Sequence, residues 1–238
     1  MSLLPVNDAK TRILQGVKPL PGERVDLSQA LGRVLARPVK ARRDQPAFAC
    51  SSMDGFAVRA ADVARMPTDL AVIGESKAGG AFAGRVNAGQ AVSIYTGAPL
   101  PKGADTIVIQ EDTRLNRGIV SILEAPKPGK FVRPRGFDFT SGQTLIETSR
   151  RLTARDNGVA ASANCDVVTV RKRPVIALIG TGDELVMPGE KPRADQIDSS
   201  NNAALAGFIR QFGGEAKDLG IVPDRLAAIK RAIYKASE

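Results

Sequence analysis

Carboxylates and hydroxyls gather at the predicted end of one buried strand. The run "RPVIALIGTGDEL" (173–185) begins as an apolar segment and ends in a polar loop that holds Gly180, Thr181, Gly182, Asp183 and Glu184. Ligands of open α/β sheets bind at the carboxyl ends of the strands. Carboxylate and hydroxyl oxygens also suit hard cations such as Mg²⁺. This loop is therefore a candidate ligand and metal site.

The segment that follows adds an anion-binding feature to the same sheet edge. Free N–H groups at a helix start favour an anion, and a helix is predicted to start in "DSSNN", at Asp198, Ser199, Ser200 and Asn201. The next predicted strand, "AKDLGIVPD", places Asp224 at this edge as well. An alternative stays open, in which these residues only cap one helix and Asp224 caps the next.

Three motifs further upstream present charged or hydroxyl groups. In "FACSSMDGFAV", Asp54 precedes Gly55, which indicates either a turn or a presented carboxylate. In "YTGAPLPKGAD", Thr96 follows a predicted strand and opens a rigid Gly- and Pro-containing loop suited to binding. In "RPRGFD", Arg133 and Asp138 lie close together, and arginine suits bidentate binding of oxyanions. The plainer alternatives are connecting turns and a solvated ion pair of little energetic weight.

The composition limits the chemistry that these groups can perform. The 238 residues include no histidine and only two cysteines, which excludes histidine-based nucleophilic sites and argues against zinc or disulfide frameworks. The net charge of +9 attracts anions. Aromatic residues make up only 4%, so little is available to stack bases and nucleic acid is not expected as a partner. Without an apolar run of about 20 residues or a signal-peptide pattern, we expect no membrane association and a cytoplasmic location.

The order of predicted elements indicates a multi-domain α+β and α/β protein. A short helix is expected over 7–16, capped by Asn7, and a small β module over 48–138, with strands in "LAVIG", "AVSIYTG", "DTIVIQE" and "GIVSIL". Thr153 and Asp156 form a capping-box pattern before a helix. Strand, helix, strand and helix then follow, which is typical of a parallel sheet. A parallel sheet needs more than two strands, so the sequence predicts a fragment of a longer protein.

These motifs, taken in order, resemble one family. "PAFACSSMDGFAV", "YTGAPLPKGADTIV", "VRPRGFDF", "NGVAASAN", "RPVIALIGTGDELVMPGE" and "QIDSSNNAAL" together resemble the molybdopterin molybdenumtransferases, the family of MoeA and the gephyrin E domain. Each motif is weak alone, and their order and spacing make the combination specific. The resemblance implies four parts: an N-terminal helical segment (1–22), an elongated mixed domain (23–45 and 139–171), an inserted β domain (46–138) and an incomplete three-layer α/β molybdopterin-binding domain (172–238).

The resemblance also implies a reaction and a partner arrangement. Family members insert molybdate into adenylylated molybdopterin, use Mg²⁺ and release AMP. They are homodimers whose active cleft is shared between subunits, and molybdopterin adenylyltransferase is the expected partner protein. By motif match, the residues that would face the partner's cleft are Asp54, Thr96, Arg133 and Asp138. Those that would line the pterin and metal side are Glu184, Ser199, Ser200 and Asp224, with Glu184 and Asp224 as the metal ligands.

Some positions depart from the family pattern. Phe137 and Arg225 stand where acidic, small or polar residues are frequent, and the chain ends before the family's downstream Gly-Gly-Val-Ser loop and C-terminal barrel. We therefore expect residues 1–238 alone not to complete the reaction. A binding or scaffold module for molybdopterin or partner proteins is the alternative function.

Overall fold

The computed structural model describes residues 4–124 and 126–237, which form two compact units. The first, called here the α/β unit, comprises Met1–Pro38, Glu147–Asn157 and Val167–Glu238. The second, called here the β unit, comprises Val39–Ile146 and Gly158–Asp166. The predicted multi-domain α+β class is confirmed, whereas the finer division into four parts stays a prediction.

The β unit is built around a mixed sheet of six strands in the order β7-β4-β6-β5-β9-β8. The strands are β4 (Gly55–Val58), β5 (Thr68–Ser76), β6 (Gln90–Ile94), β7 (Thr106–Ile109), β8 (Thr113–Asn116) and β9 (Ile119–Ile122). The four strands expected from sequence are β5, β6, β7 and β9, and all four are confirmed. Short pairs join β2 (Val39–Lys40) to β11 (Thr144–Ile146) and β3 (Cys50–Ser51) to β10 (Val132–Arg133).

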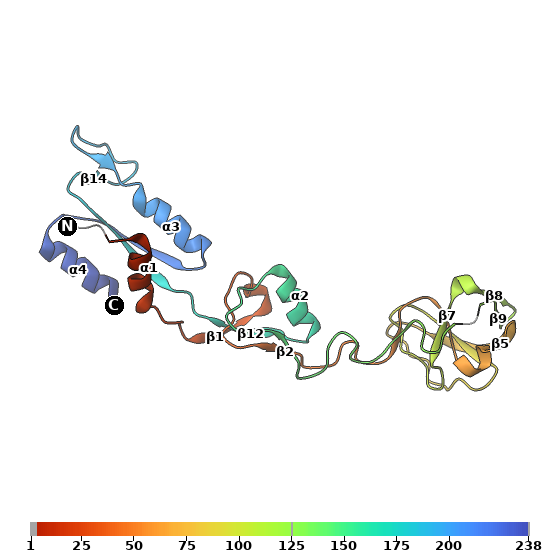
Figure 1. The fold of residues 1–238 in the computed structure, drawn as a ribbon. Helices are drawn as coiled ribbons and strands as arrows, with labels where there is room; N and C mark the ends of the chain where they lie inside the picture. Colours follow the sequence, from red (N-terminus) through yellow and green to blue (C-terminus); the bar gives the residue numbers. More distant parts are fainter. Residues whose placement is uncertain (1–3, 125, 238) are drawn as a thin grey trace. The chain divides into compact units, whose positions relative to one another are not determined.

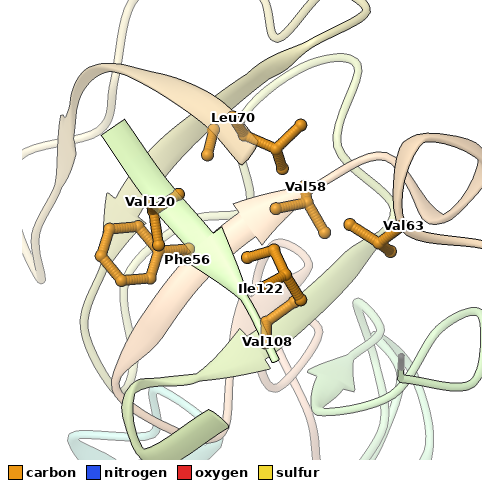
Figure 2. Packing of buried hydrophobic residues seen from close by; sticks show 8 residues of the cluster. Phe56, Val58, Val63, Leu70, Val108, Val120 and Ile122 are labelled. Atoms are coloured by element: carbon orange, nitrogen blue, oxygen red, sulfur yellow. The ribbon is translucent and has the colours of Figure 1, made fainter. Parts of the chain in front are cut away.

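Strand β4 lies inside this sheet although its sequence, "GFAV", gives no alternation of apolar and polar residues. All four of its residues are buried, and it pairs with β6 on one side and β7 on the other. Phe56 and Val58 from β4 pack with Val63, Leu70 and further aliphatic side chains, as Figure 2 shows. The sequence of a strand buried on both faces is a continuous apolar run. A search for alternating apolar and polar residues therefore does not identify β4.

The α/β unit contains two pairs of longer strands. Strands β1 (Gly22–Asp26) and β12 (Val167–Arg171) pair antiparallel, while β13 (Val175–Thr181) and β16 (Glu215–Val222) pair parallel. Helices α3 (Asn201–Gln211) and α4 (Leu226–Ser237) pack against β13 and β16, which run between them in Figure 1. The short strands β14 (Leu185–Val186) and β15 (Ile197–Asp198) pair beside this layer. The predicted strand-helix-strand-helix order with parallel strands is confirmed.

Two helix starts show which capping predictions hold. Helix α1 (Val6–Gln15) begins after Pro5 without a side-chain cap, so the expectation that Asn7 caps it is wrong: Asn7 already lies inside the first turn. In α2 (Ala154–Ser162), the Thr153 N–H and hydroxyl donate to Oδ2 of Asp156 at 2.8 and 2.7 Å, which confirms the capping box. Within the described residues, no helix is long and apolar enough to cross a bilayer.

Candidate functional site

A polar cavity of about 350 Å³ lies where β13 ends and α3 begins. It contains six of the residues predicted from sequence, namely Gly180, Thr181, Asp198, Ser199, Ser200 and Asn201. Ile179, Leu185, Ile197 and Leu205 add apolar wall, and Asn202 adds a buried amide. The strand-end rule therefore brings these residues together, because β13 leads through the short strands β14 and β15 into α3 within one unit.

The helix start in this cavity is not closed by its own side chains. Ser200 occupies the N-cap position of α3 but makes no side-chain capping hydrogen bond, and Asp198 lies in β15 instead of capping the helix. The capping alternative is thus wrong for these two residues. The first backbone N–H groups of a helix lack partners inside the helix, so this start can donate to a bound anion.

Hydrogen bonds between the buried Asn202, the exposed Asp218 and Gly220 support the inner wall of the cavity. Asn202, only 7% exposed, donates from Nδ2 to Oδ1 of Asp218 at 2.9 Å. The same oxygen accepts the Gly220 N–H at 2.9 Å, at the irregular stretch where the register between β13 and β16 shifts. The network joins the first turn of α3 to the strand beside it. Neither side chain was singled out from the sequence. The signal that could have found them is an amide in the predicted helix and a carboxylate in the strand predicted to follow it.

The remaining predicted residues of the α/β unit lie outside the cavity lining. The Asp224 N–H donates to Oδ1 of Asp183 at 3.3 Å, so the two strand-end loops meet at one edge. The Glu184 carboxylate folds over Gly182, where an added Cβ would lie 2.6 Å from Oε2. Among the described residues, no three or more potential metal-ligating side chains gather in one place. Mg²⁺ is commonly bound through one or two carboxylates and substrate phosphates, so these oxygen donors fit such an ion.

In the β unit, Thr96 fixes the carboxylate of Asp54. Oδ1 of Asp54 accepts the Thr96 N–H at 2.7 Å and the Thr96 hydroxyl at 2.8 Å. The Asp54 carbonyl accepts the Gln110 N–H at 3.1 Å, which holds the backbone. The hydrogen bonds from Thr96, the backbone one first, lower the pKa of Asp54 below its ordinary value. Asp54 is exposed, so the structure presents an ionised carboxylate with a defined orientation.

Gly55 is required beside Asp54 by close packing. An added Cβ would overlap the carbonyl oxygen of Val108 and lie 2.9 Å from the Cα of Ile109, both in the backbone of β7. Gly55 is the first residue of β4 and is buried there. Its observed role is to let the first residue of β4 approach the neighbouring strand.

A second cavity, of about 310 Å³, lies beside Asp54 in the β unit. Its polar lining includes Ser93, Tyr95, Gln110 and Thr113, none of which was singled out from sequence. These residues come from β6, the position directly after it, β8 and the turn between β7 and β8. Their approach to Asp54 depends on strand order, which the sequence does not specify.

The third predicted motif forms an ion pair away from this cavity. One guanidinium nitrogen of Arg133 donates to both oxygens of Asp138, at 2.7 and 2.9 Å, and Arg133 also lies over the Phe137 ring at 5.4 Å. Both charged side chains are 41% exposed. Neither belongs to the lining of the cavity beside Asp54, so the structure does not join the two motifs into one cavity.

Residues 4–164 match the protein family described as "MoeA N-terminal region (domain I and II)". The chain belongs to the MoeA family. Residues 177–238 match a second description, "Probable molybdopterin binding domain", and this segment contains the cavity between β13 and α3. The resemblance stated from the motifs is confirmed.

MoeA relatives align along most of the chain. It is 41% identical to the molybdopterin molybdenumtransferase of a Nostoc species over 218 residues, which cover 90% of this chain and 50% of the relative. The enzyme of that name from Haemophilus influenzae is 31% identical, with 98% of this chain and 58% of the relative covered. The chain therefore spans a little over half the length of these relatives.

Solved MoeA structures share the fold. Two crystal structures of the molybdopterin biosynthesis MoeA protein from Pyrococcus horikoshii match with TM-scores of 0.88 and 0.92, at 32% and 29% identity. Each match covers 99% of this chain, with 61% and 64% of the archaeal chain.

Proposed function

We propose that the protein takes part in molybdenum cofactor biosynthesis as a molybdopterin molybdenumtransferase. Its reaction is the Mg²⁺-dependent insertion of molybdate into adenylylated molybdopterin, with release of AMP. The relatives that align over most of the chain bear that enzyme name. We place the reaction in the cytoplasm, with molybdopterin adenylyltransferase as the protein that supplies the adenylylated substrate.

The cavity between β13 and α3 is the observation that carries this proposal. Its lining combines hydroxyls, amides and a free helix start with an apolar wall, inside the segment that matches a probable molybdopterin-binding domain. A pterin ring suits the apolar wall, and anionic phosphate groups suit the hydroxyls and the helix N–H groups. Ser199, Ser200 and Asn201 therefore hold the substrate's phosphate end in this proposal.

We assign the metal to the neighbouring strand-end loops. Glu184 and Asp224 are the proposed Mg²⁺ ligands, and Asp183 orients the second loop through its contact with the Asp224 N–H. When bound, the ion would neutralise phosphate charge and polarise phosphoryl oxygens. This chain's carboxylates contribute only oxygen ligands, the type that Mg²⁺ prefers.

Asp54 is the proposed reacting carboxylate of the β unit. Thr96 keeps it ionised and oriented, so it can accept a hydrogen bond or a proton from the water that attacks the phosphoanhydride and releases AMP as molybdate is inserted. We propose a homodimer in which Asp54 of one subunit completes the cleft of the other. Arg133, oriented by Asp138, would interact with oxyanion charge at the same cleft.

A charge placed at the start of α3 tests the substrate cavity. Asn201→Glu adds an acid where a helix tolerates one, so the fold is retained while the anionic substrate is repelled. We expect binding of adenylylated molybdopterin, measured by isothermal titration, to weaken about tenfold or more. Gln211→Glu, at the other end of α3, carries the same charge change and should bind normally. Equal affinity of the two variants would contradict the assignment. In a protein extended to the relatives' full length, binding without AMP release on addition of molybdate and Mg²⁺ would instead favour a binding module.

A further inference from the structure

A third cavity, of about 350 Å³, lies in the α/β unit on surfaces that the proposed reaction does not use. Four segments line it: 17–20 after α1, 32–34 before β2, 171–174 between β12 and β13, and 212–213 after α3. None of these residues lines the cavity between β13 and α3. A volume of this size suits a small molecule.

The charged side chains that line this cavity are all positive. The cations are Lys18, Arg33, Arg171, Lys172 and Arg173, and the described lining contains no Asp or Glu. Arg33 is neutralised by an ion pair with Glu23. The other four form no ion pair within the described part of the chain. Excess positive charge beside an apolar wall concentrates anions, because the wall excludes the water that would screen it.

The apolar wall of the cavity includes an exposed aromatic ring. Phe212, directly after α3, is 74% exposed, and Val17 is 66% exposed. Leu20 and Val34 continue the wall from two other segments. A planar ring of a ligand can stack on this exposed phenyl ring. The lining therefore suits a molecule that has both a planar ring and an anionic group.

Hydrogen bonds join the four lining segments to one another. Arg151 donates from Nε to the Gly32 carbonyl at 3.2 Å and from Nη2 to the Gln211 carbonyl at 2.9 Å, which joins the loop before β2 to the end of α3. Arg171 donates from Nη1 to the Leu20 carbonyl at 3.0 Å and from its backbone N–H to the Val34 carbonyl at 2.7 Å. The cavity is thus held open by the fold, and a ligand need not order its walls.

From these observations we infer a second ligand site, specific for a small phosphorylated compound with a planar ring, such as a mononucleotide. Lys172 and Arg173 bind the phosphate, and the ring packs on Phe212 and the aliphatic wall. No side-chain hydrogen bond within the described residues occupies either cation, so both are available to the ligand. This site goes beyond the proposed transferase reaction, which uses the other edge of the unit.

Titration of the purified chain with AMP, adenosine and inorganic phosphate tests this site. We expect Arg173→Glu to weaken AMP binding about tenfold, the value of a charge-assisted hydrogen bond, and Phe212→Ala to weaken it roughly fivefold through lost stacking. Phe212→Ala should leave phosphate binding unchanged. Lys230→Glu, an equal charge reversal on α4, should have no effect. High salt should weaken AMP binding in the wild-type chain.

The position of AMP is checked with the variant made for the other cavity. Asn201→Glu should bind AMP at this site as the wild type does, whatever its effect on adenylylated molybdopterin, so the two proposals fail separately. AMP binding that is lost in Asn201→Glu and kept in Arg173→Glu would overturn the inference. Equal affinity for AMP and phosphate would also overturn it, because the aromatic wall would then contribute nothing.

Discussion

The two candidate sites differ in how much of their chemistry is fixed before a ligand arrives. In the β unit, two hydrogen bonds from Thr96 hold one oxygen of Asp54, and the carboxylate is charged and oriented. In the α/β unit, the cavity wall is fixed by Asn202 and Asp218, while the hydroxyl of Ser200 at its rim makes no capping bond. The first arrangement suits a reacting group, and the second suits a binding surface whose donors await an anion.

The largest effect should come from crowding the strand that carries Asp54. In Gly55→Ala the added methyl would overlap the Val108 carbonyl, so we expect a loss of about 3 kcal/mol in the free energy of unfolding. Urea denaturation measures this. Gly158→Ala is the matched control, because its Cβ meets open space in α2 and should not destabilise. Normal stability of Gly55→Ala would show that Asp54 does not depend on this close approach.

A smaller loss is expected where the cavity wall of the α/β unit is fixed. Asp218→Ala leaves the buried Asn202 amide without its partner, which should cost about 2 kcal/mol. Asp218→Asn keeps an oxygen acceptor at the same place and should be close to wild type in urea denaturation. Wild-type stability of Asp218→Ala would show that the Asn202–Asp218 hydrogen bond does not hold the cavity wall in place.

The smallest change concerns the charge of Asp54. Thr96→Val removes one of the two hydrogen bonds, so the pKa of Asp54 should rise towards its ordinary value of about 3.9. A carboxyl with a lowered pKa stabilises the fold above its ordinary pKa, and this stability is lost as pH falls through the lowered value. In the variant this contribution should be smaller, and its loss should be complete at a higher pH. NMR titration of the Asp54 carboxyl measures the shift.

Thr113→Val is the control for that titration. Thr113 lines the same cavity, but its hydroxyl donates to the Gln110 carbonyl and not to Asp54. The pKa of Asp54 should therefore stay as in the wild type. An equal rise of the Asp54 pKa in both variants would mean that the overall polarity of the cavity lowers this pKa, and not the hydrogen bonds from Thr96.

The α/β site could be predicted from sequence to a large extent, because it depends on local order. One strand, one loop and the next helix bring Gly180, Thr181, Ser199 and Ser200 together, and the rule for strand ends applies directly. The parallel pairing of β13 and β16 follows from the alternation of strands and helices. The absence of a side-chain cap at Ser200 could not be predicted, since the same residues are common caps.

The β-unit site depends on contacts that sequence order does not encode. Asp54 and Thr96 are separated by 42 positions and meet only because β4 and β6 pair within the sheet. The lining residues Tyr95 and Gln110 come into the cavity beside Asp54 through that strand order. Arg133 and Asp138 could be paired from sequence because they are near neighbours, yet their separation from the Asp54 cavity required the structure.

Molybdate insertion by Asp54→Asn tests the central claim most directly. Asparagine keeps the oxygen that accepts from Thr96, so the fold is retained and only the charge is lost. The assay uses a protein extended to the relatives' full length, supplied with adenylylated molybdopterin, molybdate and Mg²⁺. We expect AMP release by the variant to fall about a hundredfold or more. Thermal unfolding should shift only slightly, because the Thr96 hydrogen bonds remain but meet a neutral acceptor, and substrate binding should match the wild type. Unchanged AMP release in a normally folded Asp54→Asn variant would contradict the account, because Asp54 would then be a turn residue and not a reacting carboxylate.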